Sequence, residues 1–227
     1  MELTVIIPVY NEEKTLEEIV RRVKDTGLVN EILIVDDGST DGTKEILKSY
    51  EGDPLVRVLS SEKNQGKGAA VRRGIMEAKS EYALIQDADL EYNPKNYPML
   101  IKPIEDGIAD VVYGSRFLGA ARRPILFWNM VANKILTLTT NILYNNILSD
   151  METGYKLFKV SMIREIPLHA RSFDFEPEFT AKILKRNFRI YEVPIDFTPR
   201  YYHEGKKIKA TDGLIAFWTL IKYRFVD

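Results

Sequence analysis

The 227-residue sequence contains no cysteine, which excludes disulfide scaffolds, thiolate zinc sites and cysteine nucleophiles and fits a reducing compartment. Histidine is scarce as well. Only His169 and His203 occur, so carboxylates are the plausible ligands for any metal ion. An excess of one charge is also absent, because 32 Lys and Arg face 33 Asp and Glu, giving a net charge of −1. This balance provides no overall attraction to nucleic acid, and we predict no nucleic-acid partner.

Long hydrophobic runs are missing too. Nowhere do 18 apolar residues follow one another, so the sequence predicts no membrane-spanning helix. The first eight residues lack the basic start, the long apolar region and the cleavage site of a secretion signal, and they read as a first β-strand. Hydrophobic residues still make up 45% of the chain, which is enough for a substantial core.

Strand-like and helix-like segments alternate through the first half of the chain. Residues 3–9 form a nearly continuous β-branched run, typical of a strand buried on both faces. Apolar residues at positions 16, 19, 20 and 23 then have the spacing of one helix face. Further strands are predicted at residues 31–36, 55–59 and 82–86, and a helix at 67–79. We therefore expect an α/β fold with a mostly parallel, twisted, Rossmann-like sheet and helices on both faces.

The second half is less regular. It suggests strands at residues 110–113, 153–158 and 190–197 and helices at 124–148 and 176–186. We predict a single domain over residues 1–227, in which residues 1–118 bind a nucleotide and residues 119–227 shape the other side of the cleft.

Acidic residues follow three of the predicted strands. Glu12 comes after the first strand, Asp36 and Asp37 after the second, and Asp87 and Asp89 after the fourth. In a parallel sheet these strand ends meet at one edge, where ligands bind. Five carboxylates there repel one another, and a divalent cation would compensate. If the backbone stays extended, Asp87 and Asp89 leave on the same face and suit Mg²⁺ or Mn²⁺. Taken alone, this Asp-Ala-Asp sequence could simply end a strand in a turn.

A glycine-rich segment at residues 64–68 precedes the predicted helix at 67–79. Its small residues, its lysine and its free amide donors suit an anion site, although a glycine-eased helix start explains it equally well. It does not match a Walker loop, and no dinucleotide-binding glycine fingerprint follows the first strand. These differences argue against kinase-like and dehydrogenase functions.

Several motifs occur in a definite order along the chain. The early motifs are residues 5–12 (VIIPVYNE), 35–41 (VDDGSTD), 64–68 (NQGKG) and 87–91 (DADLE). The later motifs are residues 114–117 (GSRF), 150–158 (DMETGYKLF), 175–179 (FEPEF) and 193–208. In order and spacing, these motifs resemble an inverting family 2 glycosyltransferase with the GT-A fold. The later set resembles the branch of dolichyl-phosphate mannose and glucose synthases, which move a sugar from a nucleotide diphosphate (GDP-mannose or UDP-glucose) to a polyprenyl phosphate. This resemblance identifies the chain as a metal-dependent hexosyltransferase of that kind, with residues 1–118 as the nucleotide-sugar-binding half.

The resemblance also implies roles for particular residues. The nucleotide-binding set would be Pro8, Tyr10, Asn11, Glu12, Asp37, Lys67, Asp87, Ala88, Lys206 and Lys207. Asp87, Asp89 and Glu91 would surround the Mg²⁺ or Mn²⁺ ion. The catalytic set would be Asp89, Arg116 and Arg200, with the two arginines meeting phosphates alongside Lys206 or Lys207.

The chemistry of the acceptor decides what else the site needs. A sugar hydroxyl must lose a proton to attack, whereas a phosphate monoester is already anionic and needs only positioning by cations. Asp150, Glu176 and Glu178 are the reserve candidates for a general base, although helix capping or ion pairing explains each of them as well. Two other functions therefore stay open, namely transfer to a saccharide hydroxyl and a non-catalytic nucleotide-sugar-binding subunit.

Two segments carry more apolar surface than a water-exposed helix needs. In residues 124–148 a thin polar stripe recurs at every fourth position (Asn129, Asn133, Thr137, Asn141 and Asn145), and Lys134 is the only charge. Near the end of the chain a second apolar face comprises Leu214, Phe217, Trp218, Ile221 and Phe225. Basic residues flank both segments (Arg122, Arg123, Lys206, Lys207, Lys209, Lys222 and Arg224). One interpretation is a peripheral anchor on the cytoplasmic face of a membrane, and the other is packing in the core or in a dimer.

Overall fold

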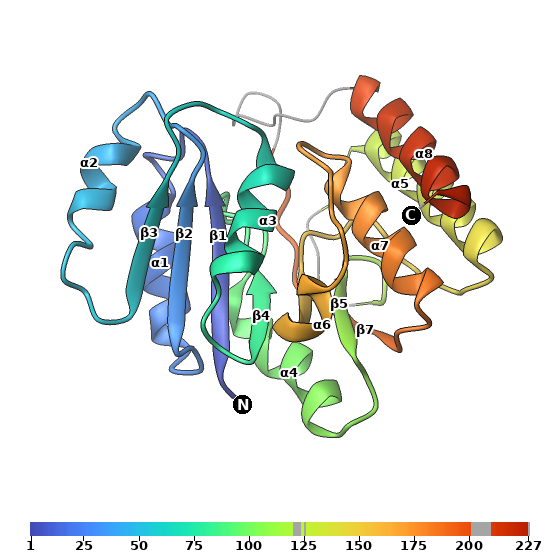
Figure 1. Ribbon diagram of the computed structural model, residues 1–227, viewed down its shortest axis with the longest axis horizontal. Helices are drawn as coiled ribbons and strands as arrows, with labels where there is room; N and C mark the ends of the chain where they lie inside the picture. The colour runs from blue at the N-terminus through green and yellow to red at the C-terminus, as the bar shows by residue number, and fades with distance from the viewer. Residues whose placement is uncertain (120–123, 125, 201–209, 227) are drawn as a thin grey trace.

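Seven strands form one twisted sheet through the centre of the molecule (Figure 1). The computed structural model describes residues 1–119, 124, 126–200 and 210–226. The strands are β1 (Leu3–Val9), β2 (Glu31–Asp36), β3 (Val56–Ser60), β4 (Tyr82–Ile85), β5 (Val111–Ser115), β6 (Lys156–Lys159) and β7 (Ile190–Pro194). Their order across the sheet is β3-β2-β1-β4-β6-β5-β7.

Most neighbouring strands run parallel, as the alternating sequence pattern predicts. The pairs β1 with β2, β1 with β4, β2 with β3 and β5 with β7 are parallel. Strand β6 lies antiparallel between β4 and β5. The prediction of a mostly parallel sheet is confirmed, but sequence periodicity did not reveal the reversed strand, because direction depends on the path of the connecting segments.

Helices cover both faces of the sheet. One face carries α1 (Leu16–Asp25), α2 (Thr43–Lys48) and α4 (Tyr97–Glu105), which follows the short 3₁₀ helix η1 (Pro94–Asn96). The other face carries α3 (Lys67–Glu77), α6 (Val160–Arg164) and α7 (Phe175–Lys185). Strand β1 shows why both faces need cover, since Val5 and Ile7 join the first core and Ile6 the second. Helix α3 lies so close to β1 that a Cβ on Gly74 would be 2.4 Å from Ile6 Cγ2.

Two further helices, α5 (Phe127–Tyr144) and α8 (Ala210–Phe225), pack on each other and on α7 at one end of the molecule (Figure 1). A small third core joins them through Leu136, Leu184 and Leu220. Neither these helices nor any other helix in the described residues has the length and apolar content needed to cross a membrane.

Several predicted boundaries move in the structure. The helix expected at residues 124–148 is α5 (Phe127–Tyr144), which ends where Asn145 adopts a left-handed conformation with φ of 49°. The strand expected at residues 153–158 is shifted to β6 (Lys156–Lys159), because residues 150–153 turn beneath the candidate site instead of joining the sheet. Helices α4 and α6 were not predicted.

Candidate active site

The loops that follow β1, β2 and β4 meet over one end of the sheet and surround a cavity of about 290 Å³. Eleven of the fourteen residues to which the resemblance gave nucleotide-binding, metal or catalytic roles line it, namely Pro8, Tyr10, Glu12, Asp37, Lys67, Asp87, Ala88, Asp89, Glu91, Arg116 and Arg200. The structure thus brings acids from three separate loops to one place, as expected when parallel strands end at a common edge. Their individual roles stay predictions.

Three singled-out residues are not in this set. Asn11 has a positive φ of 54°, and its Oδ1 accepts the backbone N–H of Thr40 at 2.8 Å. Its own N–H donates to Ser39 Oγ at 2.9 Å, so Asn11 fastens the loop after β1 to the loop after β2. Lys206 and Lys207 lie outside the described residues, as do Arg122 and Arg123.

Asp37 holds the glycine-rich segment beside the cavity. Its carboxylate accepts the backbone N–H groups of Gln65 at 2.9 Å and Gly66 at 2.7 Å. Burial raises the pKa of Asp37 despite these hydrogen bonds. Gly66 has a φ of 99°, and a Cβ there would lie 2.1 Å from the carbonyl oxygen of Arg171. Position 66 therefore needs glycine, because any side chain there would collide with the Arg171 backbone. This supports the interpretation of residues 64–68 as a glycine-eased start of the helix that follows.

Two basic side chains neutralise the acids of the cavity from within. Lys67 Nζ lies 2.8 Å from Asp87 Oδ1 and 3.0 Å from Glu176 Oε1. Burial opposes the charge of Lys67, but the two carboxylates outweigh it and raise its pKa. Arg200 Nη2 lies 3.1 Å from Asp89 Oδ2, and its Nη1 lies 3.5 Å from Glu12 Oε2. The cluster is therefore compensated by Lys67 and Arg200.

The backbone between Asp87 and Glu91 turns, so the extended geometry expected for the Asp-Ala-Asp sequence is wrong. Leu90 has a φ of 63°, and Asp89 Oδ1 accepts the backbone N–H of Glu91 at 3.1 Å. Burial and the charges of Asp87 and Glu91 raise the pKa of Asp89 to about 7. The ionised form of Asp89 is therefore unfavourable at this position, and additional positive charge nearby would stabilise it.

The expected set of three carboxylates around one ion is not assembled. Glu91 Oε1 accepts the backbone N–H of Arg200 at 2.6 Å, and no three His, Cys, Asp or Glu side chains among the described residues are grouped closely enough to hold a metal. Mg²⁺ commonly needs only one or two protein carboxylates when substrate phosphates and water supply the other ligands. Asp87 and Asp89 fit that type of site.

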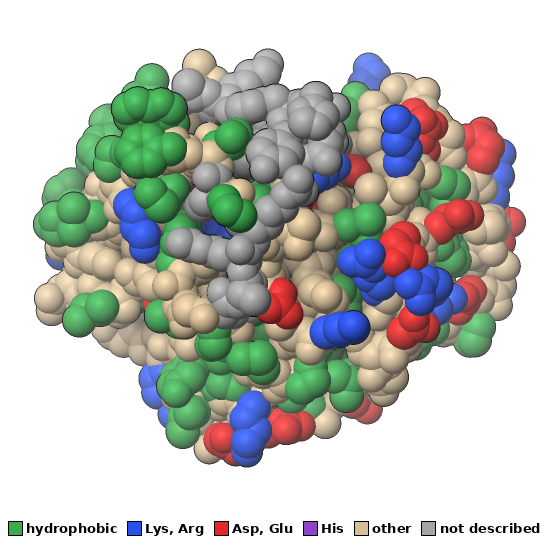
Figure 2. Space-filling model, turned by 180° about the vertical axis from the view of Figure 1, so that it is seen from behind, with side chains coloured by type: hydrophobic (Ala, Val, Ile, Leu, Met, Phe, Trp, Pro, Cys, Tyr) green, Lys and Arg blue, Asp and Glu red, His purple; other side chains and the backbone are tan. Residues whose placement is uncertain are grey.

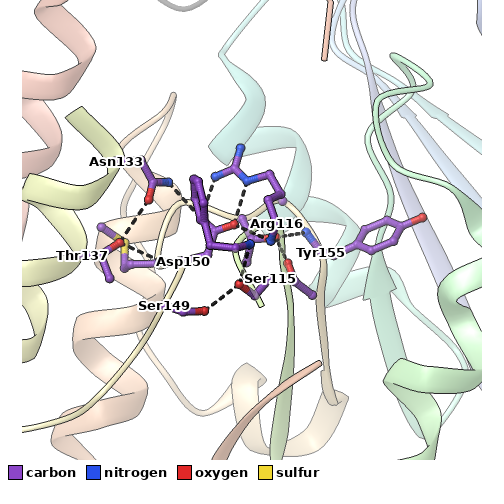
Figure 3. A network of polar contacts seen from close by, with 12 residues as sticks. Ser115, Arg116, Asn133, Thr137, Ser149, Asp150 and Tyr155 are labelled. Carbon is purple, nitrogen blue, oxygen red and sulfur yellow. Dashed lines mark hydrogen bonds and ion pairs between the residues drawn. The ribbon is translucent and has the colours of Figure 1, made fainter. Parts of the chain in front are cut away.

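Arg116 is fixed by a buried carboxylate behind the cavity (Figure 3). Its Nε and Nη2 donate to the two oxygens of Asp150, each at 2.7 Å, and Asn133 Nδ2 adds a third side-chain donor at 2.9 Å. Burial alone would raise the pKa of Asp150, but the Arg116 guanidinium and its hydrogen bonds hold it below the usual value. The Arg116 guanidinium also stacks on the Phe197 ring, with its carbon 5.2 Å from the centroid.

The reserve candidates for a general base have different environments. Asp150 is completely buried and bound to Arg116. Glu178 is also fully buried, pairs with Lys182 at 2.8 Å and accepts the backbone N–H of His169. Both carboxylates therefore stabilise the fold. Glu176, in contrast, lines the cavity.

Among the cavity residues that were not assigned a role from the sequence are Tyr92, Glu152, Ser172 and Phe173. Glu152 lies within the motif at residues 150–158, so a signal for it existed. Ser172 and Phe173 lie in the segment before α7, which reaches the cavity from far along the chain and gives no local pattern.

The family model for glycosyl transferase family 2 matches residues 4–167, a span that contains the acidic loops and Arg116. The chain belongs to glycosyl transferase family 2. This family 2 chain is 28% identical over 197 residues to the glycosyltransferase AglJ of Haloferax volcanii, covering 86% of this chain and 63% of that protein. It is 31% identical over 211 residues to the dolichol-phosphate mannosyltransferase of Pyrococcus furiosus, covering 91% and 59% respectively.

A third relative of this family 2 chain is a dolichyl-phosphate beta-glucosyltransferase of Trichomonas vaginalis, 29% identical over 239 residues, with 97% of this chain and 72% of that protein covered. The chain thus spans about six-tenths of the length of the first two relatives. Among solved structures, glucosyl-3-phosphoglycerate synthase from Mycobacterium tuberculosis, in complex with Mn²⁺, UDP and phosphoglyceric acid, superposes with a TM-score of 0.77. That match covers 100% of this chain and 79% of the other at 20% identity, and it establishes the GT-A fold.

Proposed function

We propose that this family 2 protein transfers a hexose, with inversion, from a nucleoside-diphosphate sugar to a polyprenyl phosphate in the presence of Mg²⁺ or Mn²⁺. The observation that carries the proposal is Arg200, which lines the cavity and, within the described residues, has a buried Nε with no hydrogen-bond acceptor. A buried guanidinium donor without a partner is costly, and phosphate oxygens match its geometry.

The cavity suits such a donor along its length. Pro8, Tyr10 and Asp37 would contact the nucleoside, while Asp87 and Asp89 would hold the cation together with pyrophosphate oxygens. When bound, the cation would supply positive charge that stabilises the departing diphosphate. Fold neighbours that are solved in complex with UDP and Mn²⁺ or Mg²⁺ agree with this donor class.

The basic side chains of the cavity indicate which group accepts the hexose. In the transfer, an acceptor oxygen forms a bond to the anomeric carbon while the bond from that carbon to the diphosphate oxygen breaks. A phosphate monoester attacks without losing a proton, so Arg116 and Arg200 need only orient it and offset charge. The names of the dolichol-phosphate and dolichyl-phosphate relatives support a lipid phosphate. We assign the nucleoside and pyrophosphate of the donor to residues 1–118 and acceptor binding to residues 119–227.

Arg200 is expected to compete with the cation in the free protein. Because its guanidinium lies against Asp89 and Glu12, the Arg200→Met variant should bind Mn²⁺ about tenfold more tightly when nucleotide is absent, since a nearby positive charge is removed. The same variant should bind nucleoside diphosphate more weakly in the presence of Mn²⁺. Free Mn²⁺ measured by electron paramagnetic resonance reports the first effect. Arg21→Met, on the exposed part of α1, is the control. Unchanged or weaker Mn²⁺ binding by Arg200→Met would contradict the competition.

A lipid acceptor also suits the outer surface formed by α5 and α8. The polar stripe of α5 faces inward, because Asn133 and Thr137 are buried beside Asp150 and Met151. The apolar side chains Phe127, Trp128, Ile135, Leu138, Ile142, Leu214, Ile215, Phe217, Trp218 and Phe225 are exposed instead. Figure 2 shows hydrophobic side chains gathered over these helices, on the left of the view.

The packing face of α8 differs from the apolar face expected from the sequence. Ala216, Leu220 and Tyr223 are buried, whereas Trp218 remains 65% exposed. We infer that the exposed face contacts a membrane surface, where Lys222 and Arg224 on the same helix would meet anionic headgroups. The relatives that act on dolichyl-type lipids support the same inference.

Replacing both exposed tryptophans should reduce membrane binding. The Trp128→Asn, Trp218→Asn double variant is expected to float with anionic phospholipid vesicles at least about tenfold less than the unaltered protein, because each indole contributes a large apolar contact. Met76→Asn, an exposed apolar residue on α3, is the matched control. Failure of the unaltered protein to bind vesicles, with or without anionic lipid, would overturn the surface assignment.

The proposed function is tested by incubating the protein with Mn²⁺, a polyprenyl phosphate and radiolabelled GDP-mannose or UDP-glucose. We expect label in a charged lipid fraction. Label in a water-soluble glycan would favour transfer to a saccharide hydroxyl. Nucleotide binding without any turnover would favour a non-catalytic subunit.

A further inference from the structure

Glu176 lies in the first turn of α7 and lines the cavity. Its side chain is only 6% exposed. One oxygen, Oε1, accepts from Lys67 Nζ at 3.0 Å. The other oxygen, Oε2, is buried and meets no hydrogen-bond donor in the described residues.

Glu152 reaches the same cavity from the turn before β6, and its buried Oε1 likewise meets no donor among the described residues. The charge of Glu176, acting with burial, raises the pKa of Glu152 to about 8, so the two carboxyls are close enough to influence each other. Lys156, the nearest buried cation on β6, donates instead to the backbone carbonyls of Met151 and Thr153. Glu152 and Glu176 therefore leave acceptor capacity unused beside the cavity.

This unused capacity distinguishes the pair from Asp150 and Glu178, and the buried Oδ2 of Asp36, which also meets no donor in the described residues, does not line the cavity. Both oxygens of Asp150 accept hydrogen bonds, and both oxygens of Glu178 do so as well. A buried acceptor without a donor costs about 1–3 kcal/mol, so native proteins rarely keep one unless a ligand satisfies it. Two such carboxylates on one cavity wall indicate a ligand that brings hydrogen-bond donors.

The chemistry of that ligand is restricted by its surroundings. Phosphate would be repelled by two carboxyls, and no group of three metal-binding side chains occurs among the described residues. Neutral hydroxyl groups are donors that suit carboxylates. Lys67 bridges Glu176 to Asp87, so Glu176 lies one side chain away from the proposed cation and pyrophosphate, and Glu152 lines the same cavity. A sugar attached to that pyrophosphate would lie beside them.

We propose that Glu152 and Glu176 form a hydroxyl-binding subsite that holds the hexose of the donor before and during transfer. The inference rests on the proposed function and adds the residues that recognise the transferred group. The terminal torsion of a glutamate side chain is soft, so each carboxyl can turn an oxygen toward a sugar hydroxyl with little strain. In this arrangement the subsite distinguishes a nucleoside-diphosphate hexose from the nucleoside diphosphate alone.

The test compares two pairs of ligands by isothermal titration calorimetry with Mn²⁺: UDP against UDP-glucose, and GDP against GDP-mannose. The variants are Glu176→Gln and Glu152→Gln, and Glu165→Gln, an exposed residue, is the matched control. Each variant should bind the nucleotide sugar at least about tenfold more weakly, because the carboxyl is replaced by an amide that offers one acceptor oxygen fewer to the sugar hydroxyls. Binding of the nucleoside diphosphate should change by less than about twofold, since Lys67 and Asp87 remain.

A second arm uses donors in which single hexose hydroxyls are replaced by fluorine or hydrogen. One of these hydroxyls is the proposed donor to Glu176. Replacing it should weaken donor binding to the unaltered protein but not to Glu176→Gln, so the effects of the ligand change and the protein change are non-additive. Equal weakening of nucleotide and nucleotide sugar, additive losses, or unchanged binding would overturn the subsite. A loss of turnover with unchanged binding would instead identify a general base and also overturn it. If the unaltered protein binds no nucleotide at all, the proposed function fails and the subsite with it.

Discussion

Replacing Asp89 by asparagine is expected to lower the rate of hexose transfer at least about a hundredfold, because it removes a charge that holds the cation and its pyrophosphate. Asparagine keeps the size of the side chain and one oxygen, so it can still accept the N–H of Glu91, which bonds to Oδ1, although it loses the second oxygen that accepts from Arg200. A lower transfer rate would therefore reflect the missing negative charge beside the metal ion rather than a change in the shape of the loop.

The rate is measured as label transferred to polyprenyl phosphate at saturating Mn²⁺ and donor. Asp25→Asn, an exposed carboxylate on α1, is the matched control and should retain full activity. The variant should not be less stable than the unaltered protein without metal. Because burial and neighbouring acids raise the pKa of Asp89 from 3.8 to about 7, its ionisation costs stability progressively as the pH rises through that range, and the full cost is present above it. Retention of more than about a tenth of the rate by Asp89→Asn would exclude the metal role.

Replacing Asp150 by asparagine is expected to lower the free energy of unfolding by about 3–5 kcal/mol. The carboxylate is fully buried and accepts from the Nε, Nη2 and backbone N–H of Arg116 and from Asn133. Without its charge, the guanidinium of Arg116, whose side chain is only 16% exposed, loses its compensating partner. Breaking such a pair on one side is costly because the remaining charge cannot recover its hydration.

Urea unfolding measures this change. Asp106→Asn is the matched control, because it breaks an exposed helical pair with Lys102 and should cost less than about 1 kcal/mol. In a double-mutant cycle, Arg116→Met should cost much less when Asp150 is already asparagine. If Asp150→Asn costs no more than Asp106→Asn, the pair does not anchor Arg116.

Local sequence patterns predicted much of the fold for identifiable reasons. The β-branched run of residues 3–9 is β1, buried on both faces as a central parallel strand must be. Leu16, Ile19, Val20 and Val23 are all buried on α1. Both patterns depend only on residues close in the chain, so they can be recognised without knowledge of the tertiary structure.

The site was predictable only in part. Acids placed after strands lead to one edge of a parallel sheet, and Glu12, Asp37 and Asp89 do line one cavity. The backbone after Asp87 turns, which the sequence offered only as the alternative to an extended segment, and the positive φ of Leu90 was not predicted. Glu152 and Glu176 could not be separated from capping or pairing residues, since their unused oxygens become visible only when every neighbouring donor is placed.

The sequence by itself determined the α/β class, the family and the strand ends that carry the acidic loops, because periodicity and motif order are local properties. Tertiary structure alone decided that β6 runs antiparallel, that Asp150 is committed to Arg116, and that the polar stripe of α5 faces inward while its apolar side chains stay exposed. Each of these outcomes depends on contacts between residues far apart in the chain, where burial and the pairing of charges, rather than local preference, select the arrangement.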